Sequence, residues 1–239
     1  MKIKPLIPHT LTCLNLVSGC VATLHALHGD YTGAFLWIII GAVFDFFDGF
    51  AARLLGVASP LGKELDSLAD DITFGLAPAA VVFSLLSSTE MPLAGLTTRT
   101  YLPYLAFAMA AFSAVRLAKF NLDARQTDTF IGLPTPANAL FWSALAAGFS
   151  EPILQSPDAF YGLVAGVLIS CALLVSEIPM FALKFKHFRW VGNRVRYLFL
   201  LACAVLIATF ALLGYSVMGF SVVVLLYVVL SVILRKRRI

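Results

Sequence analysis

A group of acidic residues between two apolar stretches constrains the fold of this chain more than any other feature. The segment 44–79 reads FDFFDGFAARLLGVASPLGKELDSLADDITFGLAPA and carries six of the chain's thirteen acids. Carboxylates at membrane depth are costly and are found where they bind a partner. The chain must therefore fold so that these acids meet a compensating positive charge.

The composition indicates the environment in which these acids lie. Hydrophobic residues make up 60% of the 239 positions, charged residues 13%, and the mean hydropathy is +0.92. These values exclude an ordinary soluble domain, so we predict an all-α integral membrane protein with about eight transmembrane helices. The net charge of +4 does not indicate a nucleic-acid partner, because the basic residues fall where membrane topology places them. The four cysteines form no CxxC pair and no zinc-ligand spacing.

Apolar segments of helical length follow one another along the chain. We expect helices at about residues 9–28, 32–55, 60–87, 101–120, 136–149, 158–177, 192–214 and 216–234. Pro78 is expected to kink the third helix. The chain then divides into an amphipathic N-terminal lead (1–8), a six-helix membrane core (9–177), and a part with a basic interfacial segment and two further transmembrane helices (178–239).

Basic residues are distributed unevenly over the expected loops. With eight spans, one side of the membrane collects sixteen of the seventeen Lys and Arg residues, and Arg99 alone falls on the other side. The positive-inside rule places the basic side in the cytoplasm. We therefore expect a protein of the cytoplasmic (inner) membrane whose two termini and 53–63 turn face the cytoplasm.

Two pairs of aspartates have helical spacing. Asp45 and Asp48 are three residues apart, and Asp66 and Asp70 are four apart, so each pair lies on one face of its helix. Ser59, followed by a proline, is expected to cap the second of these helices. Folding the chain back between the pairs places them at matching depth, roughly 13–20 Å from the turn at a rise of ~1.5 Å per residue.

Four carboxylates in one pocket repel one another, and a single neighbouring Arg53 cannot balance them. We therefore favour two divalent cations, Mg²⁺ or Mn²⁺, held by oxygen ligands. Gly49 and Gly62 lie within a turn of the carboxylates, where a missing side chain admits a bulky ligand. Arg53 offers planar donors that suit phosphate. Two alternatives stay open: an ion-pair network that only holds two helices together, and the pathway of a cation or proton transporter, which predicts acids spread over several helices.

This hairpin also resembles the signature of the CDP-alcohol phosphotransferase family. The match covers eight positions at fixed spacing: Asp45, Asp48, Gly49, Ala52, Arg53, Gly62, Asp66 and Asp70. The resemblance implies a membrane enzyme that moves a phosphatidyl or similar group from a CDP-linked lipid to an alcohol and releases CMP. It also implies a homodimer.

The resemblance assigns roles to individual residues. Asp45, Asp48 and Asp66 are implied as metal ligands, and Asp70 as a ligand that also serves as the catalytic general base. The residues implied to bind the CDP-linked lipid are Gly49, Arg53, Ser59, Gly62, Thr12 and Asn15. For Thr12 and Asn15, which lie in the first expected helix, hydrogen bonding between helices is an equally open interpretation.

Finer matches concern the acceptor alcohol. The segments 65–70, 74–78, 116–121 and 132–136 resemble the phosphatidylserine synthase branch, which implies CDP-diacylglycerol and L-serine as substrates. Serine is a zwitterion, so we expect Arg116 and Lys119 to bind its carboxylate, and Asp71 or a backbone carbonyl to bind its ammonium group. Membrane anchoring is the alternative role of the two cations. The alternative acceptors, glycerol 3-phosphate and inositol (phosphate), call for more basic residues than the hairpin offers.

Overall fold

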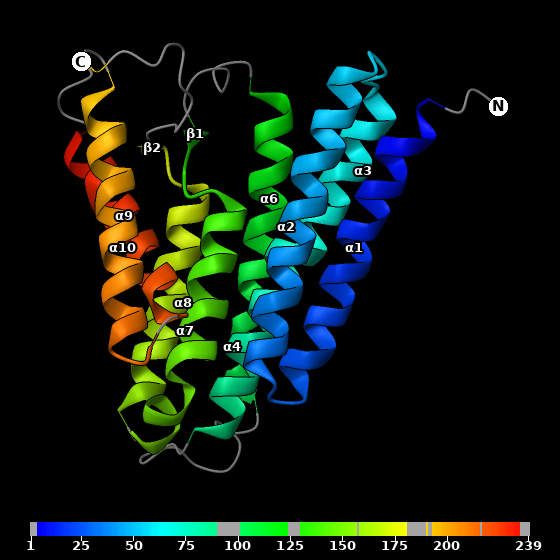
Figure 1. Cartoon of the computed structure of the whole chain (residues 1–239). Coiled ribbons are helices and arrows are strands. Elements are labelled where there is room, and N and C mark those ends of the chain that lie inside the picture. Colours follow the sequence, from blue (N-terminus) through cyan, green and yellow to red (C-terminus); the bar gives the residue numbers. More distant parts are fainter. Residues whose placement is uncertain are drawn as a thin grey trace.

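The computed structural model describes residues 4–89, 101–123, 130–156, 158–180, 190, 193–215 and 217–234. Its long helices form one bundle (Figure 1), which confirms the predicted all-α class. The first half of the chain contains α1 (Leu6–Leu27), α2 (Tyr31–Leu54), α3 (Pro60–Asp70), η1 (Asp71–Leu76), α4 (Ala77–Ser88), η2 (Leu102–Phe107) and α6 (Ala108–Leu122). The second half contains β1 (Phe130–Ile131), α7 (Thr135–Gln155), α8 (Ala159–Val175), β2 (Pro179–Met180), α9 (Arg194–Leu212) and α10 (Met218–Leu234).

Helix length and composition agree with a protein that is integral to the membrane. In the described part of the chain, five helical segments are long and apolar enough to span a membrane: Leu6–Leu27, Tyr31–Leu54, Pro60–Ser88, Leu102–Leu122 and Arg194–Leu212. The apolar helices α8 and α10 are shorter, with 17 residues each. Strands β1 and β2 pair antiparallel, so the chain that leads into α7 is tied to the chain that leaves α8.

Two boundaries differ from the sequence-based expectation, and one expected segment is largely not described. Helix α1 already begins at Leu6, so the expected N-terminal lead is partly helical; residues 1–3 lie outside the described chain. Helix α7 extends to Gln155, with a break at Phe149, where φ is −146°. Most of the expected interfacial segment also lies outside the described residues, namely 181–189 and 191–192.

The third expected helix contains a π-helical segment. α3 and α4 are joined through η1, whose six residues (Asp71–Leu76) have π-helical hydrogen bonding. Pro78 lies in the first turn of α4, directly after this segment, so the irregularity precedes the proline at which the kink was expected. A π turn adds residues to one turn of a helix, so it changes which face the residues on either side present.

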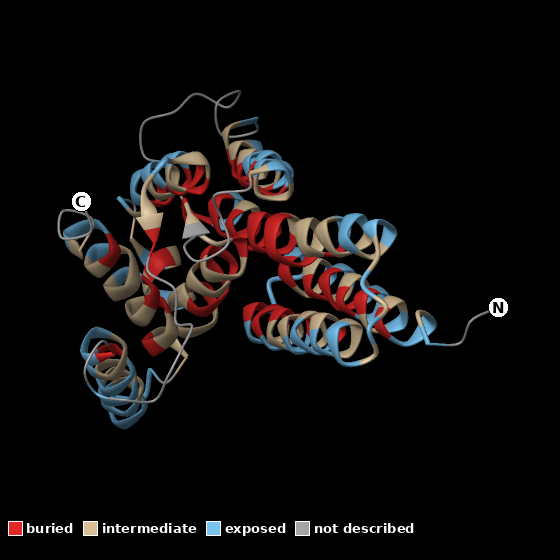
Figure 2. Cartoon of the chain, turned by 90° about the horizontal axis from the view of Figure 1, so that it is seen from above, coloured by how far each residue is buried: buried red, intermediate tan, exposed pale blue. Residues whose placement is uncertain are grey.

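The two ends of the bundle differ in what they bury. The N-terminal end of α1, the α2–α3 turn and the C-terminal end of α6 lie together at one end (Figure 1). Towards the other end, a large apolar cluster joins helices α1, α2, α4, α7 and α8. Figure 2 shows that buried residues line the interior between the helices and that exposed residues cover their outer faces. The acids of the hairpin lie at the first of these ends.

Candidate active site

The hairpin of α2 and α3 is built from local signals. Ser59 accepts a hydrogen bond from the backbone N–H of Gly62 at 3.1 Å, and Pro60 occupies the first helical position. The turn before it contains Gly56 at φ +61°, a conformation that favours glycine. The expected cap is therefore confirmed, and it directs α3 back along α2.

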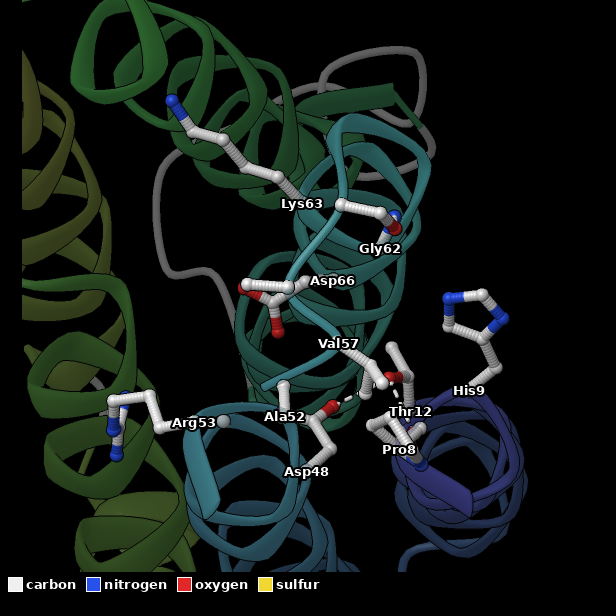
Figure 3. Close-up of a pocket in the computed structure, with 13 residues that line it drawn as sticks. Pro8, His9, Thr12, Asp48, Ala52, Arg53, Val57, Gly62, Lys63 and Asp66 are labelled. Carbon is white, nitrogen blue, oxygen red and sulfur yellow. Dashed lines mark hydrogen bonds between the residues drawn. The ribbon is translucent and has the colours of Figure 1, made fainter. Parts of the chain in front are cut away.

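Three of the four predicted metal ligands lie together. One oxygen of each of Asp45, Asp48 and Asp66 lies within 4.8 Å of the others. Asp48 is 5% exposed, and Oδ1 of Asp66 is buried with no hydrogen-bond partner among the described residues. Figure 3 shows Asp48 on α2 and Asp66 on the facing α3. Carboxylate oxygens of this kind are the ligands that Mg²⁺, Mn²⁺ and Ca²⁺ prefer.

The fourth aspartate, Asp70, is not one of the three whose oxygens lie within 4.8 Å of one another, and a residue of α1 holds it. Nδ2 of the fully buried Asn15 donates a hydrogen bond to Oδ1 of Asp70 at 3.2 Å. Thr73 Oγ1 in turn donates to the backbone carbonyl of Asn15 at 2.9 Å. Asn15 Oδ1 is buried and has no partner among the described residues. Asp70 is thus oriented by α1.

A second residue of α1 supports the three-aspartate cluster. Oγ1 of buried Thr12 donates to Oδ2 of Asp48 at 2.5 Å (Figure 3). Helix α1 approaches closely because Gly41 has no side chain: a Cβ atom there would lie 3.0 Å from Asn15 Oδ1. Thr12 and Asn15 thus form the hydrogen bonds between helices that one interpretation expected, and these bonds hold carboxylates. Binding of the CDP-linked lipid by the two residues stays a prediction.

A cavity of about 220 Å³ opens between α1, α2 and α3 beside this cluster. Five of the six residues implied to bind the CDP-linked lipid line it, with Asp48 and Asp66: Thr12, Gly49, Arg53, Ser59 and Gly62. A Cβ atom at Gly49 would lie 3.3 Å from Arg53 Nη1, so this glycine leaves room for the guanidinium group. Arg53 itself is exposed, and Figure 3 shows its side chain directed away from Asp66.

The predicted acceptor residues separate into two groups. Arg116 and Lys119 line a second cavity of about 320 Å³, together with Glu177. Arg116 is 6% exposed, its Nε has no partner among the described residues, and its guanidinium lies 5.9 Å from the Phe120 ring centroid. Both cations lie on α6, which is tied to α3 because Asn121 Nδ2 donates to Ser67 Oγ at 2.8 Å. The second cavity is therefore lined by a helix that contacts the helix of Asp66 and Asp70.

Asp71 lies elsewhere, in η1. Its buried Oδ1 is close to Ser113 Oγ: a Cβ atom at Gly75 would meet both atoms, at 2.5 Å and 2.9 Å. Asp71 is not among the residues that line the cavity of Arg116 and Lys119. The described structure thus brings the two cations together and leaves Asp71 against α6.

Several residues near the site were not among the predicted site residues. His9 lines the first cavity, and a Cβ atom at Gly62 would lie 3.4 Å from its Nε2. Lys63 lines it too, but its Nζ donates to the Asn121 carbonyl at 2.8 Å and so ties α3 to α6. Tyr227 of α10 lies within electrostatic range of Arg116. His9 and Lys63 line the same cavity as the predicted residues. No signal in the sequence connects Tyr227 with the site.

Comparisons with known proteins bear on the same residues. A sequence model of the family described as CDP-alcohol phosphatidyltransferase matches residues 5–178. A CDP-diacylglycerol–serine O-phosphatidyltransferase of Bacillus subtilis is 34% identical over 183 residues, which are 77% of this chain and 91% of that protein. Proteins of the same name from Methanocaldococcus jannaschii and Saccharomyces cerevisiae are 34% and 36% identical, over 60% and 53% of this chain and 59% and 48% of their own length. The family match contains the hairpin and stops before α9.

Proposed function

Because the chain belongs to the CDP-alcohol phosphatidyltransferase family, we propose that it transfers the phosphatidyl group of CDP-diacylglycerol to L-serine. The products are phosphatidylserine and CMP. The observation that carries this proposal is the cluster of Asp45, Asp48 and Asp66 beside Asp70, on the two helices that contain the family signature. Serine as the acceptor is supported by the names of the relatives.

The aspartates fit a metal site. We propose that Asp45, Asp48, Asp66 and Asp70 hold two divalent cations, Mg²⁺ or Mn²⁺. All four offer carboxylate oxygens, and the unpartnered Oδ1 of Asp66 is a buried acceptor for which a cation is the fitting partner. When bound, the cations neutralise the pyrophosphate and polarise the phosphorus–oxygen bond that breaks.

The first cavity is proposed to bind the cytidine diphosphate part of the lipid. Arg53 stands at its rim, where its planar guanidinium suits a phosphate. Gly49 provides the space that the guanidinium needs, and Gly62 and Ser59 form the wall on α3. Thr12, which also lines the cavity, donates a hydrogen bond to Asp48 and so holds this carboxylate in a fixed position relative to the cavity wall.

Asp70 is proposed to act as the general base. Its carboxylate accepts the proton of the serine hydroxyl, the hydroxyl oxygen forms a bond to the lipid-linked phosphorus, and the bond from that phosphorus to CMP breaks. The Asn15 amide orients Asp70 by donating to Oδ1, which leaves Oδ2 for the proton. General-base assistance of this kind contributes typically ~10²–10⁴-fold to a rate.

The serine zwitterion is proposed to bind beside Arg116. Arg116 and Lys119 offer cationic donors to its carboxylate within the second cavity. Of the two expected ammonium acceptors, a backbone carbonyl suits this cavity better than Asp71, because the C-terminal residues Leu174–Ser176 of α8 form part of its wall. The C-terminal end of a helix favours a positive charge.

Orientation and assembly complete the proposal. The site is proposed to face the cytoplasm of the inner membrane together with both termini, since sixteen of the seventeen Lys and Arg residues belong to that side. A homodimer follows from the family resemblance alone. The division of the chain after residue 177 stays a prediction, and it lies next to the end of the family match at residue 178.

The test is CMP release from CDP-diacylglycerol by purified protein. Serine, glycerol 3-phosphate and inositol are offered separately, with Mg²⁺, with Mn²⁺ or with EDTA. We expect release with serine that EDTA abolishes and that either metal restores. CMP release with only one of the other alcohols would be consistent with the family reaction but would refute serine as the acceptor. A metal-dependent rise in Tm that Asp66→Asn abolishes checks the metal site without turnover.

A further inference from the structure

A third cavity, of about 370 Å³, is lined by residues of α2, η1, α7, α9 and α10. Its lining side chains are apolar apart from Tyr227, and they include Ala42, Phe74 and Val223. We call this cavity the lateral groove. It differs in chemistry from the two cavities that contain charged residues, and α9 and α10 supply a third of its lining residues from beyond the family match.

Two residues that line the lateral groove lie about one helical turn from proposed metal ligands. On α2, Ala42 lies three residues before Asp45. Ala42 is therefore about one helical turn deeper in the bundle than Asp45. On η1, Phe74 lies four residues after Asp70, so both helices bring an apolar side chain to the groove next to an aspartate. A lipid whose phosphate lies at the aspartates therefore has its glycerol end at the mouth of the groove.

Tyr227, the polar residue of the groove, lies at the end of the groove that is nearer to the aspartates. On α10, Tyr227 lies seven residues, about two helical turns, after Phe220, whose ring contacts Phe35 of α2, and on α2 the aspartates likewise follow Phe35. The hydroxyl group therefore belongs to the active-site end of the groove. A ligand that is polar at this end and apolar along its length matches this arrangement.

The other end of the groove is closed by an aromatic contact. The rings of Phe35 on α2 and Phe220 on α10 lie 5.7 Å apart, centroid to centroid. Phe35 is three residues from Ile38 and Phe220 is three from Val223, so the contact lies one turn beyond the groove on both helices. Helices α2 and α10 are in contact at these two rings, and the groove lies between the same helices on the side that is nearer to the site.

We propose that the lateral groove receives one acyl chain of the phosphatidyl group that is transferred. The inference rests on the proposed function, because that function places the lipid phosphate at the aspartates. An apolar chain gains free energy with each methylene it buries, whereas serine and the nucleotide are too polar for this lining. Helices α9 and α10 thus form a wall of the lipid site, and they make the enzyme sensitive to acyl-chain length.

The first test narrows the groove. In Val223→Trp the indole fills the space between α10 and α2, and Ile39→Trp narrows it from the side of α2. The control is Val229→Trp, because Val229 lies on the same helix but is 52% exposed and outside the groove. The kcat/KM for CMP release with serine is measured with dipalmitoyl and with dihexanoyl CDP-diacylglycerol in mixed micelles.

We expect both groove variants to lower the ratio of kcat/KM for the long chain to that for the short chain by about tenfold, which corresponds to the lost burial of about two methylenes. Val229→Trp keeps the wild-type ratio. An unchanged ratio in both groove variants, or the same fall in the control, overturns the proposal. Retained dihexanoyl activity shows that the variants are folded.

A second test needs no acceptor. CDP-diacylglycerol with a diazirine in one acyl chain is photolysed with the protein in the absence of serine, and the labelled peptides are identified by mass spectrometry. We expect label at residues 38–42 and 223–227 that unlabelled CDP-diacylglycerol competes away and that Val223→Trp removes. Label only at other residues, or label that unlabelled CDP-diacylglycerol does not compete away, overturns the proposal that the groove binds an acyl chain. Competed label in a protein that releases no CMP with serine retains the groove and refutes the acceptor.

Discussion

At one end of the bundle the buried side chains around the aspartates are polar, and at the other end nearly all buried side chains are apolar. The first end, here called the site end, buries Thr12, Asn15, Asp48, Thr73 and Arg116. The second, here called the apolar end, buries Ala26, Tyr31, Leu85, Trp142 and Phe160 in one cluster. The same helices pass through both ends, so the difference lies in the residues and not in the architecture.

The difference indicates that one end of the bundle contributes mainly to stability and the other mainly to binding. Each apolar residue removed from water at the apolar end stabilises the fold. At the site end, buried atoms such as Asp66 Oδ1, Asn15 Oδ1 and Arg116 Nε have no protein partner among the described residues, and each such atom is destabilising by about 1–3 kcal/mol. Substrate and metal are the partners that we propose for these atoms. The apolar end therefore provides stability that the site end gives up for binding.

The largest expected effect comes from changing the site end alone. Asp70→Asn keeps the shape of the side chain but removes the proton acceptor, so CMP release should fall by about 10²–10⁴-fold. CDP-diacylglycerol binding and Tm should stay near those of the wild type. Glu64→Gln, an exposed acid on the same helix, is the control. Wild-type turnover in Asp70→Asn would remove the base from the proposed mechanism.

The second effect concerns the apolar end. Trp142 is 2% exposed, and its Nε1 donates to Ser170 Oγ at 3.0 Å. Trp142→Ala should lower the free energy of unfolding by about 3–5 kcal/mol, because it leaves a cavity in the cluster. Turnover per folded molecule should not change. Thermal unfolding in detergent measures the first quantity, and activity per folded molecule measures the second.

The control for Trp142 is Leu168→Ala on α8, at a side chain that is 54% exposed. We expect its unfolding free energy to change by no more than about 0.5 kcal/mol. If Trp142→Ala reduced kcat of the folded enzyme as strongly as Asp70→Asn does, the two ends would not be separable.

A smaller effect is expected from the support of the aspartates. Thr12→Val removes the hydroxyl that donates to Asp48 and keeps the shape of the side chain. A hydrogen bond to a charged group contributes about 1.5–3 kcal/mol, so kcat/KM should fall by at least about tenfold. In the matched variant Thr10→Val, an exposed hydroxyl that donates to the Leu6 carbonyl of its own helix is lost. Equal kcat/KM for the two variants would contradict the support role of Thr12.

The smallest effect lies in the α1–α2 connection beyond the apolar end. Asp30 caps α2: the Gly33 N–H donates to Oδ1 at 2.8 Å, and His25 Nδ1 pairs with Oδ2 at 2.8 Å. The backbone hydrogen bond, followed by the His25 contact, lowers the pKa of Asp30 below its ordinary value of 3.8. The stability from its charge is therefore present above that value and is lost as the pH falls through the lowered pKa.

Asp30→Asn keeps a residue that caps well but carries no charge. We expect turnover to stay unchanged and Tm near neutral pH to change little. The decline of Tm on the acid side should become shallower, which thermal unfolding at pH values from about 6 to about 3 measures. A steeper acid decline in the variant would contradict the direction of the pKa shift.

The hairpin was predictable because its signals are local. Ser59, Pro60 and the two aspartate pairs lie within one stretch of sequence, and helical spacing alone determines which side chains share a face. The same argument groups Asp70 with Asp45, Asp48 and Asp66 as a metal ligand, which stays a prediction, but it could not reveal what orients Asp70. The structure shows that Asn15 donates to Asp70, a contact that depends on the close approach of α1 at Gly41.

The acceptor side was predictable only in part. The spacing of Arg116 and Lys119 correctly places both cations on one cavity, because three residues make nearly one turn. It does not reveal that Arg116 is buried, or that Asp70 and Tyr227 both contribute to its electrostatic environment. Tyr227 lies more than a hundred residues from both partners along the chain, and no pattern relates them.

The sequence by itself determined the membrane class, the family, and the helical hairpin with its aspartates. Apolar length and helical spacing follow from covalent geometry and from the solvent, and both act within a few turns of chain. Only the tertiary structure decided that three aspartates cluster while Asp70 pairs with Asn15, and that α10 brings Tyr227 and the lateral groove to the site. Those contacts depend on how distant helices pack, and packing is decided by all the side chains between them.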